Sequence, residues 1–263
     1  KNASITVQDS VLKKLRIDRD WVLNKNTFYA YGELIDTSDV DTLYRNIYNP
    51  STFTGIVFKE SLERYGTKVK TISRKKTFNK SYKKISNHLS KPLLHSAINL
   101  MNESDNLTAE LFVKSIGALD TLPGTWEVGL DSMKSFLAKE VLIDTSNIRL
   151  ADGSGVSRYN LTSAAQLNSL LKWMYNSEYK DDFISTLPGG GWENSTLEKR
   201  LIDEGDLVRA KTGGLSGVRN LAGYIKSKKY GDVAFSILMN GYTDYSSRYA
   251  RVHDQIVKSI IYD

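Results

Sequence analysis

A lysine followed by small residues, Lys211-Thr212-Gly213-Gly214, is the part of this sequence whose chemistry can be argued most directly. An ammonium group next to a hydroxyl can bind a carboxylate. The glycines beside them leave a strand edge open, so that a ligand backbone can approach and pair as an extra strand. By itself the run is more often a hairpin turn after an edge strand. Lys211, Thr212, Gly213 and Gly214 are therefore candidate binding residues that need support from elsewhere.

A second polar run, Ser104-Asp105-Asn106, follows an amphipathic helical stretch. The plainer interpretation is a helix start, because Ser and Asp are both good N-cap residues. In a functional interpretation the Ser104 hydroxyl relays a proton, the Asn106 amide holds a carbonyl group, and Asp105 shapes the turn. Ser-Asp-Asn and Lys-Thr-Gly are two of the three motifs typical of penicillin-recognising serine enzymes, and the third is Ser-x-x-Lys.

A glycine-rich run, Asp152–Asn160, lies between these two motifs. Three segments in this order resemble signatures of the D-Ala-D-Ala carboxypeptidase/endopeptidase family, the class C low-molecular-mass penicillin-binding proteins. They are MNESDNLTAELF, DGSGVSRYNLTSAAQL and AKTGGLSGVRNLAGYI. The resemblance covers roughly residues 50–263, and the run at 152–160 is specific to this family rather than to all penicillin-recognising enzymes.

The resemblance implies a role for each matching residue. Ser104, Asn106 and Lys211 would be catalytic, and the remaining positions would bind substrate or shape the cleft. These are Asp105, Asp152, Ser154, Arg158, Thr212, Gly213 and Gly214. It also implies peptidoglycan stem peptides and β-lactams as ligands, no metal or organic cofactor, and action outside the cytoplasmic membrane.

The nucleophile is the part of the family pattern that is hardest to place. A serine one helical turn before a lysine brings the amine beside the hydroxyl, so that the amine can remove its proton. Five such tetrads begin at Ser10, Ser73, Ser81, Ser169 and Ser177, and because chance alone supplies roughly two or three, their number means little. Ser169 and Ser177 come after the second motif, and Ser73 and Ser81 lie in a basic tract. Ser10 is the least unsuitable. We expect the nucleophile on a segment before Lys1, which would then be a partner of this chain.

Bulk composition sets the remaining limits. The 263 residues carry a formal charge of +6, but the basic residues are scattered, which argues against nucleic acid. The absence of cysteine excludes a thiol nucleophile and disulfides, and the three histidines lack the spacing of metal ligands. No apolar stretch is long enough to span a membrane. Oligomeric state is left open.

Hydrophobic periodicity predicts an α+β fold in which helices precede an antiparallel sheet and a covering helix. The expected helices are 53–65, 93–101, 107–119, 125–139, 161–175 and 246–262. The expected strands are 206–212, 220–226 and 233–240, with β-like runs at 3–8 and 21–34. Thr162 is the expected N-cap of the helix at 161–175. The expected buried stripe of the helix at 107–119 is Leu107, Leu111, Val113, Ile116 and Leu119.

The family resemblance implies that this α+β pattern is a penicillin-binding, DD-peptidase/β-lactamase-like domain at 71–263, preceded at 1–70 by the remainder of an insertion domain, with a connector at 71–91. The expected function is that of a serine DD-peptidase whose second and third motifs lie in this chain; the chain alone would then be inactive. A non-catalytic module that keeps only the binding strand is the alternative. A β-lactamase-like hydrolase suits the run at 152–160 less well.

Overall fold

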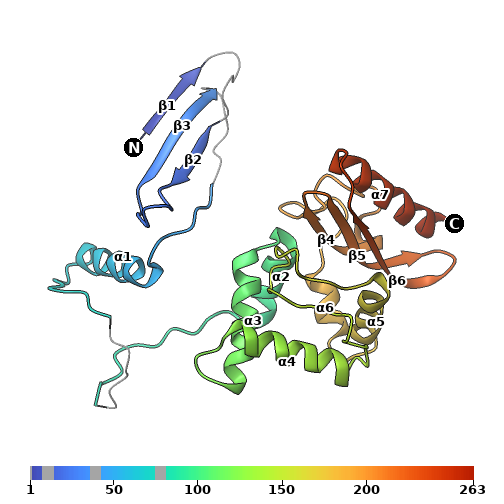
Figure 1. Ribbon diagram of the computed structural model, residues 1–263, viewed down its shortest axis with the longest axis horizontal. Helices are drawn as coiled ribbons and strands as arrows, with labels where there is room; N and C mark the ends of the chain where they lie inside the picture. Colours follow the sequence, from blue (N-terminus) through green and yellow to red (C-terminus); the bar gives the residue numbers. More distant parts are fainter. Residues whose placement is uncertain (1, 8–14, 36–42, 75–80) are drawn as a thin grey trace. The chain divides into compact units, whose positions relative to one another are not determined.

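A computed structural model describes residues 2–7, 15–35, 43–74 and 81–263 of the chain. The chain forms two compact units, Lys1–Asn87 and His88–Asp263 (Figure 1). Helices and an antiparallel sheet occur together in the second unit, so the predicted α+β class is confirmed. No helix in the described part of the chain has the length and apolarity needed to cross a bilayer.

The first unit contains a small mixed sheet and one helix. Strands β1 (Asn2–Val7), β2 (Arg16–Arg19) and β3 (Phe28–Ile35) have the order β1-β3-β2, with β1 parallel and β2 antiparallel to β3. Helix α1 (Pro50–Arg64) begins after Asn49, whose side chain accepts a hydrogen bond from Thr52 N–H. None of the described side chains in this unit is fully buried.

The predicted β-like run at 21–34 is wrong at its beginning. Residues 21–24 form a turn, and Trp21 is 70% exposed. Two side chains favour a turn here although the segment is apolar. Asp20 accepts a hydrogen bond from Leu23 N–H, and Asn24 adopts a left-handed backbone conformation with φ of 52°. The strand β3 starts only at Phe28.

The second unit begins with helices. These are α2 (Leu93–Glu103), α3 (Asn106–Asp120), α4 (Trp126–Lys139), α5 (Ala164–Tyr175) and α6 (Lys180–Thr186). Helices α3 and α4 cross so closely that a Cβ atom at Gly129 would lie 2.0 Å from the carbonyl oxygen of Val113. The cap of α5 is Ser163 in a full capping box with Gln166, so the predicted cap Thr162 is wrong by one residue.

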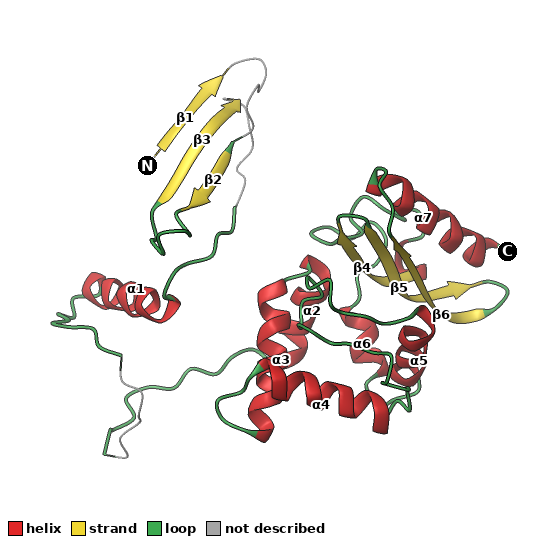
Figure 2. Cartoon of the chain, viewed as in Figure 1, coloured by secondary structure: helices red, strands yellow, loops and turns green. Residues whose placement is uncertain are grey.

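Three antiparallel strands follow in a simple meander. They are β4 (Val208–Leu215), β5 (Val218–Ser227) and β6 (Gly231–Asn240), in the order β4-β5-β6. A short 3₁₀ helix, Gly205–Leu207, leads into β4, and α7 (Ser246–Tyr262) ends the chain. In Figure 2 the strands lie between α7 on one side and the other helices of this unit on the other.

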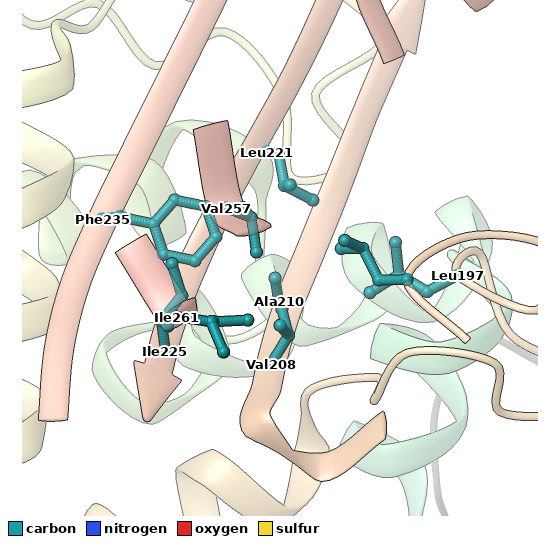
Figure 3. Packing of buried hydrophobic residues seen from close by; sticks show 9 residues of the cluster. Leu197, Val208, Ala210, Leu221, Ile225, Phe235, Val257 and Ile261 are labelled. Atoms are coloured by element: carbon teal, nitrogen blue, oxygen red, sulfur yellow. The ribbon is translucent and has the colours of Figure 1, made fainter. Parts of the chain in front are cut away.

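The two faces of this sheet carry separate cores. Figure 3 shows the core under α7, where Val208, Leu221 and Phe235 from the strands pack against Val257 and Ile261. On the opposite face a second cluster joins the strands to α2, α5 and α6. Its members are Leu171, Leu187 and Tyr224, with Met101, Tyr175, Phe183, Ile184, Ala222 and Ala234 around them. The sheet is therefore held rigidly from both sides.

The predicted buried stripe of α3 is largely wrong. Leu107, Leu111 and Leu119 are 66%, 52% and 86% exposed, whereas Val113 is 3% exposed. The buried residues of α3 are Val113 and Gly117, which face α4 across the close crossing. Periodicity identified the helix correctly, but the side that becomes buried depends on which element packs against it.

Candidate active site

The two motifs singled out in the sequence meet in the second unit. The ammonium Nζ of Lys211 on β4 donates a hydrogen bond of 2.8 Å to the hydroxyl Oγ of Ser104, 107 residues earlier in the chain. The same ammonium donates to the carbonyl oxygen of Thr212 at 3.0 Å. Lys211 and Ser104 therefore belong to one site, which lies between the end of α2 and the first strand of the sheet.

Ser104 is placed by an abrupt change of direction between two helices. It is the C-cap of α2, with φ of 60° and ψ of 48°, and Asp105 is the N-cap of α3. A left-handed backbone is uncommon for a residue other than glycine, and such conformations are concentrated at functional sites. The turn leaves the Ser104 side chain exposed at the helix junction, facing β4.

Asp105 serves mainly as the cap that holds this junction. Its carboxylate accepts hydrogen bonds from the N–H groups of Leu107 at 3.1 Å and Thr108 at 3.2 Å. Hydrogen bonds from the Thr108 hydroxyl and from these N–H groups hold the pKa of Asp105 below its ordinary value, against the opposing effect of partial burial. Asn106 follows as the first residue of α3, with an exposed side chain next to Ser104.

Lys211 has an unusual environment for a surface-strand lysine. Burial lowers its pKa from 10.5 to about 8. No carboxylate contributes to this shift, so the ammonium has a hydroxyl and a carbonyl as partners but no counter-charge within the described residues. A partly desolvated cation without a counter-ion is suited to binding an anionic ligand group.

The edge of β4 beside Lys211 is open. Ala210 N–H points away from β5, since it donates to the Pro188 carbonyl at 2.9 Å. Successive N–H groups alternate in direction along a strand, so those of Thr212 and Gly214 point to the same edge. The start of that edge is occupied by the segment at Pro188 and Gly189, which forms an isolated bridge with Arg209, but no described strand pairs with the edge beyond Ala210. An extended ligand can pair there.

Glycine keeps this edge accessible. Gly213 and Gly214 have no Cβ atoms beside the open N–H groups, and Thr212, which precedes them, is half-buried. A Cβ at Gly213 would meet Asn220 Cβ at 3.5 Å, an ordinary contact, so the fold itself tolerates a larger residue there. The advantage of glycine at Gly213 therefore concerns what approaches the strand from outside.

The glycine-rich run at 152–160 forms a loop that holds itself together. Asp152 accepts hydrogen bonds from Gly155 N–H at 2.8 Å, from Asn160 Nδ2 at 2.7 Å and from Ser157 N–H. Both carboxylate oxygens are thus used inside the loop, which fits the predicted shaping role of Asp152. Arg158 reaches out of the loop and donates to the Ser216 carbonyl at 2.7 Å, in the turn between β4 and β5.

Glu110 on α3 anchors this loop and is not among the site residues predicted from the sequence. Its carboxylate accepts from the N–H groups of Gly153 and Ser154, both at 3.0 Å, and from Trp126 Nε1 at 2.8 Å. Burial raises the pKa of Glu110, but hydrogen bonds from the Ser154 side chain, these N–H groups and Trp126 outweigh it, so the pKa lies below its ordinary value. The available signal was an acidic residue between the apolar Ala109 and Leu111, six positions after Ser104.

The loop also lies flat against α3. A Cβ at Gly153 would come within 2.6 Å of Val113 Cγ2 and 2.7 Å of the Ala109 carbonyl oxygen. The glycine is therefore required for this close packing. The loop is hydrogen-bonded to α3 through Glu110 and to the β4–β5 turn through Arg158. It therefore connects the helix that follows Ser104 with the end of the strand that carries Lys211.

Comparison with known proteins identifies the chain. The sequence profile of the D-Ala-D-Ala carboxypeptidase 3 (S13) family matches residues 3–259. The chain belongs to this family. The D-alanyl-D-alanine carboxypeptidase of Actinomadura sp. (strain R39) is 32% identical over 252 residues, which cover 92% of this chain and 46% of that protein. D-alanyl-D-alanine carboxypeptidase DacB of Haemophilus influenzae is 34% identical over 163 residues, covering 60% of this chain and 34% of DacB.

A solved structure from the carboxypeptidase family resembles the whole chain. It is penicillin-binding protein 4 (dacB) from Haemophilus influenzae complexed with a β-lactam, with a TM-score of 0.77 and 25% identity. The match covers 95% of this chain and 60% of that protein. The predicted family and penicillin-binding fold are therefore confirmed. This chain spans less than half the length of the two curated relatives described above.

The two Ser-x-x-Lys tetrads of the second unit do not supply a nucleophile to the candidate site. Ser169 and Ser177 use their hydroxyls to donate to the carbonyls of Ala165 and Met174, in and at the end of α5. Ser73 and Ser81 lie in the first unit, and Ser10 lies outside the described residues. Within the second unit, neither Ser169 nor Ser177 donates its hydroxyl to Lys211 or Ser104.

Proposed function

We propose that the protein to which this chain belongs is a serine DD-peptidase that acts on the D-Ala-D-Ala ends of peptidoglycan stem peptides, as a carboxypeptidase or endopeptidase. The contact between Lys211 Nζ and Ser104 Oγ at the open edge of β4 carries the proposal. It combines a cation for a terminal carboxylate with a hydroxyl for proton transfer. Family membership and the names of the relatives support the same activity.

The substrate would bind as an extra strand along β4. Its backbone would accept hydrogen bonds from the outward N–H groups of Thr212 and Gly214, and Gly213 would let it approach. Lys211 and the Thr212 hydroxyl would hold the terminal carboxylate. Desolvation strengthens such a pair, because water no longer competes for the ammonium group.

The acyl-transfer step needs a nucleophilic serine, and we propose that a part of the protein outside the described residues supplies it. Its attack on the penultimate D-Ala carbonyl would expel the terminal D-Ala amine. The proton that the nucleophilic serine loses would reach that amine through Ser104, which is hydrogen-bonded to the Lys211 ammonium. Asn106 would orient the substrate carbonyl, and water would then release the acyl group.

The remaining predicted residues would act by shaping the site. Asp105 would hold the helix junction that presents Ser104, and Asp152 would hold the loop at 152–160. Ser154 and Arg158 would form the wall of the cleft, since they attach that loop to α3 and to the β4–β5 turn. β-Lactams would bind at the same place, as the complex of the similar penicillin-binding protein 4 supports.

Two further parts of the proposal concern context. Action on peptidoglycan requires a location outside the cytoplasmic membrane. Residues 1–70 would belong to an insertion domain and 71–263 to the DD-peptidase-like domain, with a connector at 71–91. The division of the chain into compact units at Asn87 and His88 supports a boundary in that connector.

The test uses the full-length protein, a fluorescent penicillin and a soluble peptide that ends in D-Ala-D-Ala. We expect D-Ala release and a covalent penicillin adduct, with the labelled serine located by mass spectrometry. Lys211→Ala should slow acylation about 100-fold, as expected for truncating one partner of a desolvated charge pair. Lys226→Ala, which removes an exposed lysine on β5, is the control and should acylate normally.

Near-normal acylation of Lys211→Ala would contradict the role given to Lys211. An adduct on Ser10 would place the nucleophile in this chain. No adduct and no D-Ala release from the full-length protein would contradict the peptidase and favour a non-catalytic binding module.

A further inference from the structure

An open cavity of about 630 Å³ lies along α5 and the turn that follows it. Part of its wall comes from Ser169, Lys172, Trp173 and Asn176, which recur at the i, i+3, i+4 and i+7 positions of one helix face. The opposite face of α5 packs on the sheet through Leu171, whose carbonyl accepts a buried hydrogen bond of 2.7 Å from the Tyr224 hydroxyl. The cavity is thus separate from the Lys211 site but belongs to the same unit.

Aromatic side chains provide the apolar surface of this cavity. Trp173 is half-buried, and its ring meets Phe136 edge to face with centroids 5.1 Å apart and an interplanar angle of 86°. It also packs against the cluster of Val141, Ile143 and Ile148, so the position of the indole is fixed. Tyr179 lies at the cavity wall and is 55% exposed.

Hydrogen bonds fix the turn that carries Tyr179. The Ser177 hydroxyl donates to the Met174 carbonyl at 2.8 Å and accepts from Tyr179 N–H at 3.2 Å. The exposed tyrosine ring therefore stands on a well-held backbone. A preformed aromatic surface costs little conformational entropy when a ligand binds.

The polar groups of the cavity offer both donors and acceptors. Asn176 Nδ2 donates to the Lys172 carbonyl at 2.7 Å, which leaves Oδ1 as an acceptor. The Ser169 hydroxyl donates to the Ala165 carbonyl at 3.1 Å and so also keeps lone pairs to accept. Lys172 and Glu178 add one cation and one carboxylate, and neither side chain forms an ion pair within the described residues.

We propose that this cavity binds a neutral saccharide. Sugar rings have an apolar C–H face that can lie on an aromatic ring, and hydroxyls around the rim that both donate and accept. One lysine and one glutamate balance in charge, which disfavours phosphates and nucleic acids. The polar half of the lining disfavours a purely aliphatic ligand. The inference deepens the proposed function, on which its biological meaning rests: the saccharide would be the glycan part of peptidoglycan.

The test is a titration of the full-length protein with chitotetraose, a peptide-free N-acetylglucosamine oligomer, followed by calorimetry or by NMR of the indole signals. We expect saturable binding by the wild type. Tyr179→Ala should weaken it about fivefold or more, as expected from the loss of one aromatic contact. Tyr179→Phe should retain most of the affinity, because the ring remains.

The matched control is Tyr245→Ala, which removes another tyrosine, 77% exposed, outside the cavity and should leave binding unchanged. Absence of saturable binding by the wild type, or equal binding by Tyr179→Ala and Tyr245→Ala, would overturn the inference. Folding of each variant is checked by circular dichroism, and Tyr179→Phe covers the case in which Tyr179→Ala fails to fold.

D-Ala release from a soluble peptide is measured on the same proteins. Tyr179→Ala should release D-Ala at the wild-type rate, since Tyr179 takes no part in the hydrogen bonds that join Lys211 to Ser104 and Thr212. Lost saccharide binding with normal D-Ala release in Tyr179→Ala supports the inference. Chitotetraose binding without any D-Ala release would support the cavity and contradict the peptidase, so the two proposals fail in distinguishable ways.

Discussion

Lys211 is the residue on which the proposed chemistry depends most. Its ammonium group is partly buried, contacts a hydroxyl and a carbonyl, and has a pKa of about 8. Burial therefore disfavours the charged form of Lys211, and a bound ligand carboxylate can offset this free-energy cost. Binding of that carboxylate requires the protonated lysine, which is the form present below pH 8.

At penicillin concentrations that leave most of the protein free, the rate constant for acylation should therefore fall as the pH rises from 7 to 9.5. In this range Lys211 loses its proton, whereas an ordinary lysine with a pKa of 10.5 would stay charged. Stopped-flow measurements on the full-length protein would show the fall, which reports the pKa of the free enzyme.

Lys211→Arg is the control for this pH profile, because arginine stays protonated throughout the range. Its rate constant should be lower but should not show the additional fall near pH 8. An identical fall in wild type and Lys211→Arg would assign the titration to another group.

His253 is a second residue with an altered charge equilibrium. It is 0% exposed on α7, and neither ring nitrogen has a hydrogen-bond partner within the described residues. Burial, reinforced by Arg200 and Arg219 and opposed by Asp254, lowers its pKa from 6.5 to about 4. The folded protein therefore keeps His253 neutral over a range in which the unfolded chain takes up a proton.

Stability should therefore fall as pH decreases from 6.5 towards 4. The unfolded state binds the additional proton in this window, so the contribution is about 1.4 kcal/mol per pH unit. Urea titrations at several pH values would measure the slope. His253→Leu should flatten it, whereas His95→Leu, which replaces an exposed histidine, should not. An unchanged slope in His253→Leu would show that other groups control acid stability.

At the scale of elements, the loop at 152–160 and helix α3 form one structural assembly through Glu110. A single carboxylate accepts hydrogen bonds from two backbone N–H groups of the loop and from the Trp126 indole of α4. Removing it would leave the half-buried N–H groups of Gly153 and Ser154 and the partly exposed Trp126 indole without this partner. Such donors cost more than the lost bond itself is worth.

Glu110→Ala should lower the free energy of unfolding by about 1–3 kcal/mol. Glu110→Gln retains one accepting oxygen and should lose less. Urea unfolding followed by far-UV circular dichroism measures both variants, with Glu140→Ala at an exposed position as the control. Equal stability of Glu110→Ala and Glu140→Ala would mean that the loop does not depend on this anchor.

For the whole molecule, the contrast between the two units has a measurable consequence. None of the described side chains in Lys1–Asn87 is fully buried, whereas His88–Asp263 contains cores on both faces of its sheet. Burial of apolar surface is the main source of stability. The two units should therefore differ strongly in how often their backbone hydrogen bonds open.

Hydrogen exchange of this chain, followed by mass spectrometry, should show fast exchange in β3 and slow exchange in β5. Both are paired on two sides, so the comparison separates packing from strand pairing. Protection of β3 equal to that of β5 would contradict the expectation.

Much of the secondary structure was predictable because its signals are local. The spacing of apolar residues identified α2, α4 and α7, and three β-runs identified the sheet. The predicted secondary structure was wrong where a few side chains determine the position of a helix cap or a turn. Ser163 rather than Thr162 caps α5, because Gln166 completes the capping box with it, and the turn at 21–24 overrides an apolar run.

The sequence by itself determined the family and the types of residue at the site, because these reside in short runs whose order can be read along the chain. Only the tertiary structure shows that Lys211 Nζ donates a hydrogen bond to Ser104 Oγ and that Leu107 is exposed. It also shows that the Asp152 carboxylate binds groups of its own loop. Those outcomes depend on packing between elements far apart in sequence. Local propensity does not determine which face of a helix becomes buried. That face is determined by the sheet and the helices that pack against it.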